Sequence, residues 1–418
     1  MKIAVINGSP RGKSSSTLYC VKHIQKHFPE HEFSVIDAGR SIMRMDRNDA
    51  YLNECFEEVR TSDVVLWSFP VYVFTAPSQL VRFVELIFEK EQQPAFQGKY
   101  TTAITTSANF YDHTAHHYIR NICEDLEMPY FEGFSANMFE LRDEQLRQNL
   151  EQFAGDFFRH STEKIDLLQT TQSLSKIRLD YQPSAIESQA KKGEKKLALV
   201  TDCMEKDQNL QRMIETFCQT ASFPVTVYNL NDTDIRGGCT GCTNCMGTGH
   251  CRYNDDFETF YKETLLQYQG IIYAFSIGKR YYSATVKKFF DRCFVNGHRH
   301  VLEWLLEGYI ISGPLRELPY LREIINAGSQ LGGRASAGIV TDELSTSDQL
   351  TTKIKQLADS VQRLFDNPWK RPPTFLGVGG HKVFRDLVYT WRELMTEDHK
   401  YYQEQGLYDF PNIEKSET

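Results

Sequence analysis

The fold is decided by Val64-Val-Leu-Trp-Ser-Phe69 and the segment after it, Pro70-Val-Tyr-Val-Phe-Thr-Ala-Pro77. A short and almost entirely apolar run predicts a strand buried on both faces, as in a parallel sheet that helices cover on either side. A helical pattern through Leu80, Phe83 and Ile87 follows the second segment. A buried strand, a loop and a helix in this order are typical of the α/β class.

The same alternation continues on both sides of this stretch. Strands are expected at residues 3–6, 33–36 and 100–107, and helices at residues 18–28 and 51–59. This pattern predicts a doubly wound parallel sheet over residues 1–165. In such sheets ligands bind beyond the carboxyl ends of the strands.

The first of these loops is Asn7-Gly-Ser-Pro-Arg-Gly-Lys-Ser-Ser-Ser-Thr17. Backbone amides, hydroxyls and a helix N-terminus in one turn favour a bound phosphate. The spacing fits neither the Walker loop nor the dinucleotide motif G-x-G-x-x-G. We therefore expect a single phosphomonoester, as on FMN, while an ordinary capped turn between strand and helix remains the alternative.

Three loops leave the carboxyl ends of the expected strands, at residues 8–17, 70–77 and 106–111. The first is expected to bind the phosphate and the other two to flank a flat ring. The expected FMN contacts are Ser9, Arg11, Ser14, Ser15, Ser16, Thr17, Pro70, Val71, Tyr72, Val73, Phe74, Thr106, Ser107 and Asn109.

The second half of the chain repeats the first. Residues 69–83 align without a gap with residues 275–289, and aromatic, basic and small positions are largely kept. This predicts a second domain of the same fold at residues 195–366, after a polar linker at residues 166–194. The phosphate loop is not kept, because Asp202-Cys-Met-Glu205 stands where the first copy has Gly8-Ser-Pro-Arg11. Phosphate binding should be lost there.

Only the second copy contains Cys239-Thr-Gly-Cys242-Thr-Asn-Cys245-Met-Gly-Thr-Gly-His-Cys251. Four of the ten cysteines fall within thirteen residues, spaced C-x2-C-x2-C-x5-C. Such compact spacing favours one thiolate-bound iron–sulfur cluster, whereas zinc sites usually separate two C-x2-C pairs by a long span. A zinc knuckle and a disulfide pair remain the alternatives.

Composition excludes several classes of protein. The chain has 418 residues and a net charge of −8, and no basic stripe or recognition motif suggests nucleic acid. No apolar run reaches the roughly 20 residues of a membrane helix, and the chain starts directly with a strand, so we expect no signal peptide. A reducing, cytoplasmic setting is expected. His113, His116 and His117 have no acidic partner at a fitting spacing and are interpreted as surface or helix-start residues, and Cys20, Cys55 and Cys123 as buried thiols.

These motifs resemble the NADPH-dependent FMN reductase group of flavodoxin-like proteins, and more closely the iron–sulfur flavoproteins. Gly8-Ser-Pro-Arg11 and Pro70-Val-Tyr72 match the FMN loops of the group, and the four-cysteine motif matches that of the iron–sulfur members. The resemblance implies FMN and a [4Fe-4S] cluster held by Cys239, Cys242, Cys245 and Cys251. It also implies a pseudo-dimer, since family members look like homo-oligomers in which one subunit's cluster faces a neighbour's flavin.

The expected architecture is therefore two tandem flavodoxin-like α/β domains with an aromatic-rich C-terminal extension at residues 367–418. We interpret the extension as a strap over a domain face, with a lid over the flavin as the alternative. The expected function is an oxidoreductase that passes electrons between a small-molecule or protein donor and an acceptor, with NAD(P)H a candidate donor and a homodimer of pseudo-dimers a candidate assembly. Two alternatives remain: an NAD(P)H-dependent FMN or quinone reductase with a structural metal, and a redox carrier or sensor without a substrate of its own.

Overall fold

A computed structural model describes residues 1–137, 140–175, 178–186, 188–302 and 305–409. Residues 410–418 of the expected C-terminal extension lie outside this range. The chain divides into two compact units. The first unit contains residues 1–174 together with residues 238–241 and 279–291, and the second contains the remainder.

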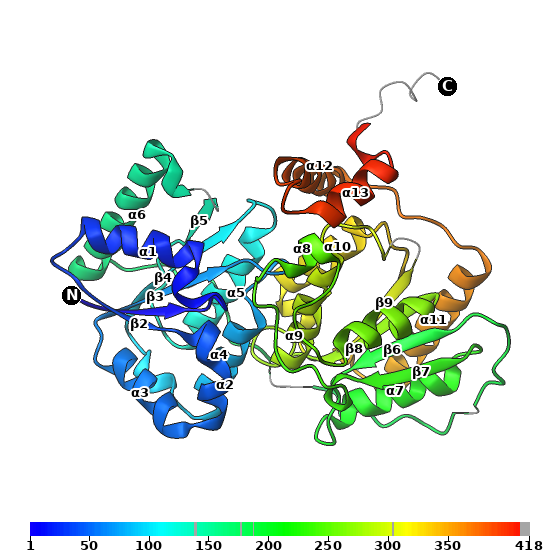
Figure 1. Cartoon of the computed structure of the whole chain (residues 1–418). Coiled ribbons are helices and arrows are strands. Elements are labelled where there is room, and N and C mark those ends of the chain that lie inside the picture. The colour runs from blue at the N-terminus through cyan, green and yellow to red at the C-terminus, as the bar shows by residue number, and fades with distance from the viewer. Residues whose placement is uncertain (138–139, 176–177, 187, 303–304, 410–418) are drawn as a thin grey trace. The chain divides into compact units, whose positions relative to one another are not determined.

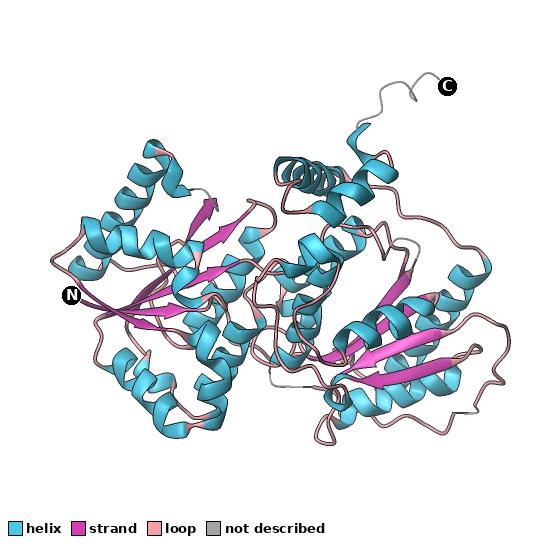
Figure 2. Cartoon of the chain, viewed as in Figure 1, coloured by secondary structure: helices cyan, strands magenta, loops and turns pink. Residues whose placement is uncertain are grey.

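The first unit is built on a parallel sheet of order β2-β1-β3-β4-β5 (Figures 1 and 2). Its strands are β1 (Lys2–Asn7), β2 (Glu32–Ile36), β3 (Val64–Pro70), β4 (Tyr100–Ser107) and β5 (Phe134–Asn137). Its helices are α1 (Ser16–His27), α2 (Ala38–Arg47), α3 (Asp49–Arg60), α4 (Ser78–Glu89), α5 (Asp112–Asp125) and α6 (Glu144–Glu163). Helices α1 and α6 cover one face of the sheet, and α2, α3 and α4 cover the other (Figure 1).

The two faces follow from the alternation of side chains along the strands. Ile3 and Val5 point into a cluster with apolar residues of α1 and α6, such as Leu18 and Phe157. On the other face the ring of Trp67 stacks on that of Phe96 at 6.2 Å. Both faces of β3 are therefore buried, as its apolar sequence predicts.

The sheet of the second unit has the order β10-β9-β8-β6-β7. Its strands are β6 (Leu197–Thr201), β7 (Val225–Asn229), β8 (Gly270–Ser276), β9 (Leu306–Ser312) and β10 (Ser336–Thr341). The later helices are α7 (Gln208–Thr220), α8 (Asn244–Thr248), α9 (Ala284–Arg292), α10 (Pro319–Leu331), α11 (Ser347–Asp366), α12 (Phe375–Thr390) and α13 (Thr396–Glu404). Apolar residues of α7 and α11 form one core with β6, β8 and β9.

Both sheets have the strand order 2-1-3-4-5 of flavodoxin-like folds, counted within each unit. Their central strands also pair in the same register. β3 and β4 pair from Val64↔Tyr100 to Pro70↔Thr106, and β8 and β9 pair from Gly270↔Leu306 to Ser276↔Ser312. One constant offset along the chain relates these pairs, so the predicted fold class of two tandem flavodoxin-like domains is confirmed.

The polar segment expected as a linker packs against the second unit, most deeply at Tyr181. Tyr181 is fully buried in the core of the second unit, and its hydroxyl hydrogen bonds with Thr216 Oγ1 at 3.0 Å and Thr351 Oγ1 at 2.9 Å. These two threonines lie on α7 and α11. The segment is thus fastened to the helical face of the second sheet.

Helices α12 and α13 form a small core of their own around Val388, Met395 and Tyr402. Met246 of the cysteine motif packs against this core, and Thr396 Oγ1 donates to the Gly247 carbonyl at 3.2 Å. The described part of the extension therefore packs beside the cysteine motif. Within the described residues, no helix is both long enough and apolar enough to cross a bilayer.

Candidate functional site

The phosphate loop joins β1 to α1 through a short 3-10 turn at Gly12–Ser14. Gly12 has φ +56°, a conformation that favours glycine. Arg11, Ser14 and Ser16 are exposed on this loop. They and the N-terminus of α1, where backbone amides point out of the helix, suit an anionic ligand.

The other three predicted hydroxyls of this loop already have partners. Ser9 Oγ accepts from the Arg11 amide at 3.3 Å, and Ser15 Oγ caps α1 by accepting from the Leu18 amide at 3.4 Å. Thr17 Oγ1 lies 2.5 Å from Thr106 Oγ1. Ser9 and Ser15 thus shape the loop, and Thr17 ties it to the end of β4.

The second loop leaves β3 at Pro70 and makes a tight turn. The amide of Tyr72 donates to the Thr75 carbonyl at 2.8 Å, and the amide of Thr75 donates back to Tyr72 at 3.1 Å. Val73 and Phe74 have φ of +42° and +66°. A β-branched residue rarely adopts such a conformation, which costs energy and is a feature of functional sites. Val71 is held by its amide, which donates to the Thr106 carbonyl at 3.0 Å.

The third loop carries Ser107 and Asn109 beyond the end of β4. Ser107 Oγ accepts from the Asn109 amide at 2.8 Å, and Asn137 Nδ2 donates to Asn109 Oδ1 at 2.9 Å. Asn109 also has a positive φ, +56°. The Phe74 ring lies 6.3 Å from Phe110 and 5.2 Å from Tyr111. The second and third loops therefore meet in one aromatic cluster.

The structure thus brings the three predicted loops together at the carboxyl ends of β1, β3 and β4. The residues suit FMN: Arg11 and the exposed serines fit a phosphate, and the loop at Tyr72–Phe74 supplies flat side chains and backbone groups. Thr75 Oγ1 is buried without a hydrogen-bonding partner among the described residues. A buried hydroxyl of this kind is costly unless a ligand or water completes it.

Support beneath the phosphate loop was not anticipated from the sequence. A Cβ on Gly39 of α2 would lie 2.4 Å from the Ser9 carbonyl carbon and 2.5 Å from that of Gly8. Asn7 Nδ2 donates to Asp37 Oδ1 at 2.9 Å, and burial raises the pKa of Asp37. In the sequence, the small residue Gly39 within Ala38-Gly39-Arg40 was the one feature that could have indicated this close contact.

The three neighbouring histidines do not form a metal site in the described part of the chain. His113 and His117 are exposed on α5. His116 Nε2 lies 3.0 Å from Thr105 Oγ1 and 2.9 Å from Ser135 Oγ. Burial lowers the pKa of His116 to about 4, so its ring is neutral near pH 7.

The cysteine motif is divided between the two compact units. Residues 238–241, with Cys239, belong to the first unit. There Gln79 Nε2 donates to the Cys239 carbonyl at 3.2 Å, and a Cβ on Gly241 would lie 2.3 Å from the Tyr72 hydroxyl. The first cysteine segment therefore lies against Tyr72, in the loop that follows β3, and against the start of α4. Thr240 Oγ1 in this segment is buried without a partner among the described residues.

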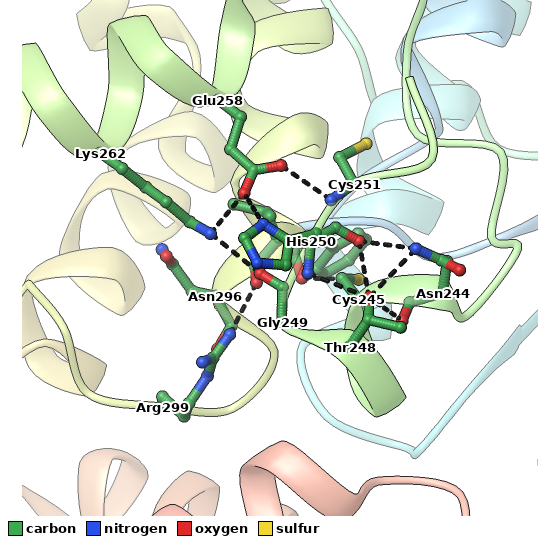
Figure 3. Close-up of polar contacts among 12 residues, drawn as sticks. Asn244, Cys245, Thr248, Gly249, His250, Cys251, Glu258, Lys262, Asn296 and Arg299 are labelled. Atoms are coloured by element: carbon green, nitrogen blue, oxygen red, sulfur yellow. Dashed lines mark hydrogen bonds and ion pairs between the residues drawn. The ribbon is translucent and has the colours of Figure 1, made fainter. Parts of the chain in front are cut away.

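Cys242, Cys245 and Cys251 belong to the second unit, around the short helix α8. Cys245 Sγ donates to the Phe294 carbonyl at 3.4 Å. The Cys251 amide donates to Glu258 at 2.9 Å, and Glu258 also receives hydrogen bonds from Lys262 at 2.5 Å (Figure 3). The Cys251 side chain points away from this polar network in Figure 3.

Arg292 holds residues on both sides of the cysteine motif, at Gly237 and Asp255. The sequence did not single out this arginine. Its guanidinium donates to the Gly237 carbonyl at 3.0 Å and to both oxygens of Asp255 at 2.9 and 2.8 Å. It also lies over the rings of Tyr253 and Phe257, 4.4 and 4.8 Å from their centres. Burial alone would raise the pKa of Asp255, but the bonds to Arg292, together with those from the Arg236 and Phe257 amides, outweigh it and the pKa is lowered.

The four cysteines of the motif supply thiolates, the ligands that iron–sulfur clusters use. No disulfide joins any of the ten cysteines, all of which lie within the described residues. Burial, with a smaller effect of the neighbouring Cys242 and Cys251, raises the pKa of Cys245 to about 11. The described residues nevertheless form no group of three or more metal-binding side chains. Thiolates repel one another until a metal neutralises them, so such ligands converge fully only on binding.

The turn after β6, where the sequence predicts that phosphate binding is lost, is acidic and is closed by its own hydrogen bonds. Met204 donates its amide to Asp207 at 3.0 Å, and burial raises the pKa of Cys203 to about 11 with the help of Asp207 and Asp202. Asn209, near the start of α7, accepts from the Tyr181 amide at 3.0 Å. A segment of the chain thus lies where the first repeat leaves its helix start open.

Comparison with known proteins supports the first repeat most directly. Residues 1–140 match the family model described as NADPH-dependent FMN reductase. A curated relative, the iron-sulfur flavoprotein of Archaeoglobus fulgidus, is 24% identical over 175 residues, which are 40% of this chain and 78% of the relative.

Two solved structures are similar to part of the chain. One is an NADH:FMN oxidoreductase in its apo form, with 18% identity and a TM-score of 0.32, matching 37% of this chain and 87% of that one. The other is the flavoenzyme NAD(P)H:(acceptor) oxidoreductase of Paracoccus denitrificans, with 21% identity and a TM-score of 0.33, matching 39% and 97%.

Proposed function

We propose that this protein is a flavin-dependent oxidoreductase that carries FMN in its first repeat and a [4Fe-4S] cluster at its cysteine motif. The match of residues 1–140 to the NADPH-dependent FMN reductase model supports the flavin part of this proposal. The protein would pass electrons between a reduced donor, with NAD(P)H the first candidate, and an acceptor. The observation that carries the proposal is the convergence of the three FMN loops, joined by the Thr17–Thr106 hydrogen bond.

The residues have distinct proposed tasks. Arg11, Ser14 and Ser16 bind the phosphate at the start of α1, where the helix dipole also favours an anion. Tyr72, Val73 and Phe74, with Pro70 and Val71 before them, hold the ring from one loop, while Thr106, Ser107 and Asn109 hold it from the other. When bound, FMN supplies two-electron chemistry and the cluster supplies one-electron chemistry.

Cys239, Cys242, Cys245 and Cys251 are the proposed cluster ligands. The relative that carries iron–sulfur in its name supports this assignment, as does the mutual influence of three of the thiols. The loop around them is fixed by Arg292 and Glu258, which hold its backbone ends. Ten cysteines without a disulfide among the described residues are consistent with the reducing cytoplasm that we propose as the setting.

A second candidate function is an NAD(P)H-dependent FMN or quinone reductase whose cysteine loop is structural, with zinc. Residues 1–140 match a model described as NADPH-dependent FMN reductase, which supports the reductase activity in this candidate. The visible spectrum and the iron content of anaerobically purified protein separate the two functions, and turnover of NADPH with a panel of acceptors separates either enzyme from a redox carrier.

We predict that Cys242→Ser removes the iron and keeps the flavin, because the two sites are assigned to different groups of residues. Iron and FMN per chain would be measured after anaerobic purification, together with the broad absorbance that dithionite bleaches. Cys218→Ser, which changes a partly buried thiol of α7, is the matched control and should keep both. Full iron content in Cys242→Ser would show that the ligand assignment is wrong.

A further inference from the structure

The loop between β3 and α4, residues 71–77, contains the strained turn at Val73 and Phe74. A positive φ at two bulky residues costs energy in each, so the surrounding structure must fix the loop. Two backbone groups mark its ends, the Tyr72 carbonyl and the amide of Ser78, the first residue of α4. Residues far along the chain contact both of these groups.

Both ends contact one ion pair from α9, which lies in the first unit up to Asp291. Lys287 Nζ donates to the Tyr72 carbonyl at 2.7 Å, and Asp291 Oδ2 accepts from the Ser78 amide at 2.7 Å. Lys287 also donates to Asp291, one turn further along the helix, and both side chains are 0% exposed. Residues more than 200 positions away in sequence therefore clasp the loop.

Comparison of the corresponding residues in the two repeats shows which part of this contact occurs twice and which part occurs once. Ser78 and Glu85 of the first repeat correspond to Ala284 and Asp291 of the second. The structure shows the reciprocal bond, in which the Ala284 amide donates to Glu85 Oε1 at 2.7 Å. Glu85 of α4 and Asp291 of α9 thus act alike, because each carboxylate accepts from the first backbone amide of the opposite helix.

Lys287 has no such counterpart, because Val81 stands at the corresponding position of the first repeat. Val81 is itself buried, so an apolar residue serves that position. A buried ion pair is rarely more stable than apolar residues of similar volume. Packing alone therefore does not account for Lys287, whereas its bond to the Tyr72 carbonyl does.

We propose that Lys287 and Asp291 are positioning residues of the flavin site, which hold loop 71–77 in the conformation that receives the flavin ring. The inference rests on the proposed function, since it presumes FMN at this loop. It also means that the flavin site of the first repeat is completed by a helix of the second. The site is consequently not contained in residues 1–165 alone.

The test compares full-length variants in the binding of FMN to apoprotein. Lys287→Met and the double variant Lys287→Met/Asp291→Asn both remove the donor to Tyr72, and the double variant leaves no unpaired buried charge. We expect FMN affinity to fall about tenfold or more in both, and the visible circular dichroism of bound flavin to change. The double variant should keep a melting temperature near that of the wild type.

Glu85→Gln is the matched control, because it weakens the reciprocal contact between the same two helices without touching the loop. It should alter the melting temperature but leave FMN affinity and the flavin dichroism unchanged. Wild-type FMN affinity and dichroism in the double variant would overturn the inference and leave the proposed function standing. A wild-type protein that binds no FMN would overturn the proposed function, and this inference with it.

Discussion

At the scale of single residues, His116 shows how burial sets charge. Its Nδ1 is enclosed without a hydrogen-bonding partner among the described residues, while Nε2 contacts two hydroxyls. A second proton on this ring would add a positive charge, and the described residues offer Nδ1 no acceptor. Arg120, His113 and His117 also oppose protonation, and only Asp112 favours it.

This environment predicts a loss of stability in mild acid. The pKa of His116 is lowered from 6.5 to about 4, so the unfolded chain binds the proton more readily than the folded one. The contribution of neutral His116 to the free energy of unfolding is complete above pH 6.5 and is lost as the pH falls from 6.5 toward 4. The free energy of unfolding then changes by up to about 1.4 kcal/mol per pH unit.

The free energy of unfolding, measured with urea between pH 7 and pH 4.5, checks this. His116→Gln should have a shallower dependence on pH than the wild type. His117→Gln changes an exposed histidine of the same helix and should follow the wild type. Equal slopes in all three proteins would mean that other groups govern the acid response.

At the scale of elements, α13 depends on one buried carboxylate. Asp398 is 0% exposed and accepts from the His298 amide and from His298 Nδ1, each at 3.0 Å. Arg299 Nε lies 3.4 Å from its other oxygen. The core of α12 and α13 is small, so this anchor contributes a large share of their attachment.

We expect Asp398→Ala to release the extension while both sheets stay folded. Removing one partner from a buried charge cluster costs about 3–5 kcal/mol, enough to open a small element locally. Limited proteolysis should then cleave between residues 367 and 374 within minutes. Asp386→Ala removes an exposed carboxylate of α12 and should leave the digest unchanged, and resistance of both variants would contradict the anchoring role.

Local patterns in the sequence predicted the elements better than they predicted the site. The apolar run of β3 and the caps of α1 can be read from neighbouring residues, and the three FMN loops follow from strand order. Lys287, Arg292 and Tyr181 could not be identified in this way. Each acts through a partner far along the chain, and a charged residue in an amphipathic helix looks like any solvated position until its partner is known.

At the scale of the whole molecule, the two repeats have become unequal. The first keeps an open helix start with Arg11 and exposed serines. The second has carboxylates at the corresponding turn, and Asn209 near its helix start is bonded to the backbone of Tyr181. A carboxylate beside a phosphate is repulsive, so we expect FMN to bind in the first repeat and not in the second.

We therefore predict one FMN per chain. Arg11→Glu should weaken that single site at least tenfold, because it removes a charged hydrogen bond of about 1.5–3 kcal/mol and adds repulsion. Flavin released by acid would be counted against protein concentration after gel filtration. Lys206→Glu makes the same charge change near the altered loop of the second repeat and should have no effect. A content of two flavins in the wild type, or of one remaining in Arg11→Glu, would contradict the single-site assignment.

The equal register of the two sheets has a consequence for the history of the chain. Between the third and fourth strands of each sheet the number of residues is the same, although most of the residues differ. The copies therefore diverged there by substitution, without insertion or deletion, while the cysteine motif was accommodated in a connection before the third strand of one copy. Under the proposed assignment, each copy lacks the cofactor site that the other retains, and this difference left the spacing of the third and fourth strands unchanged.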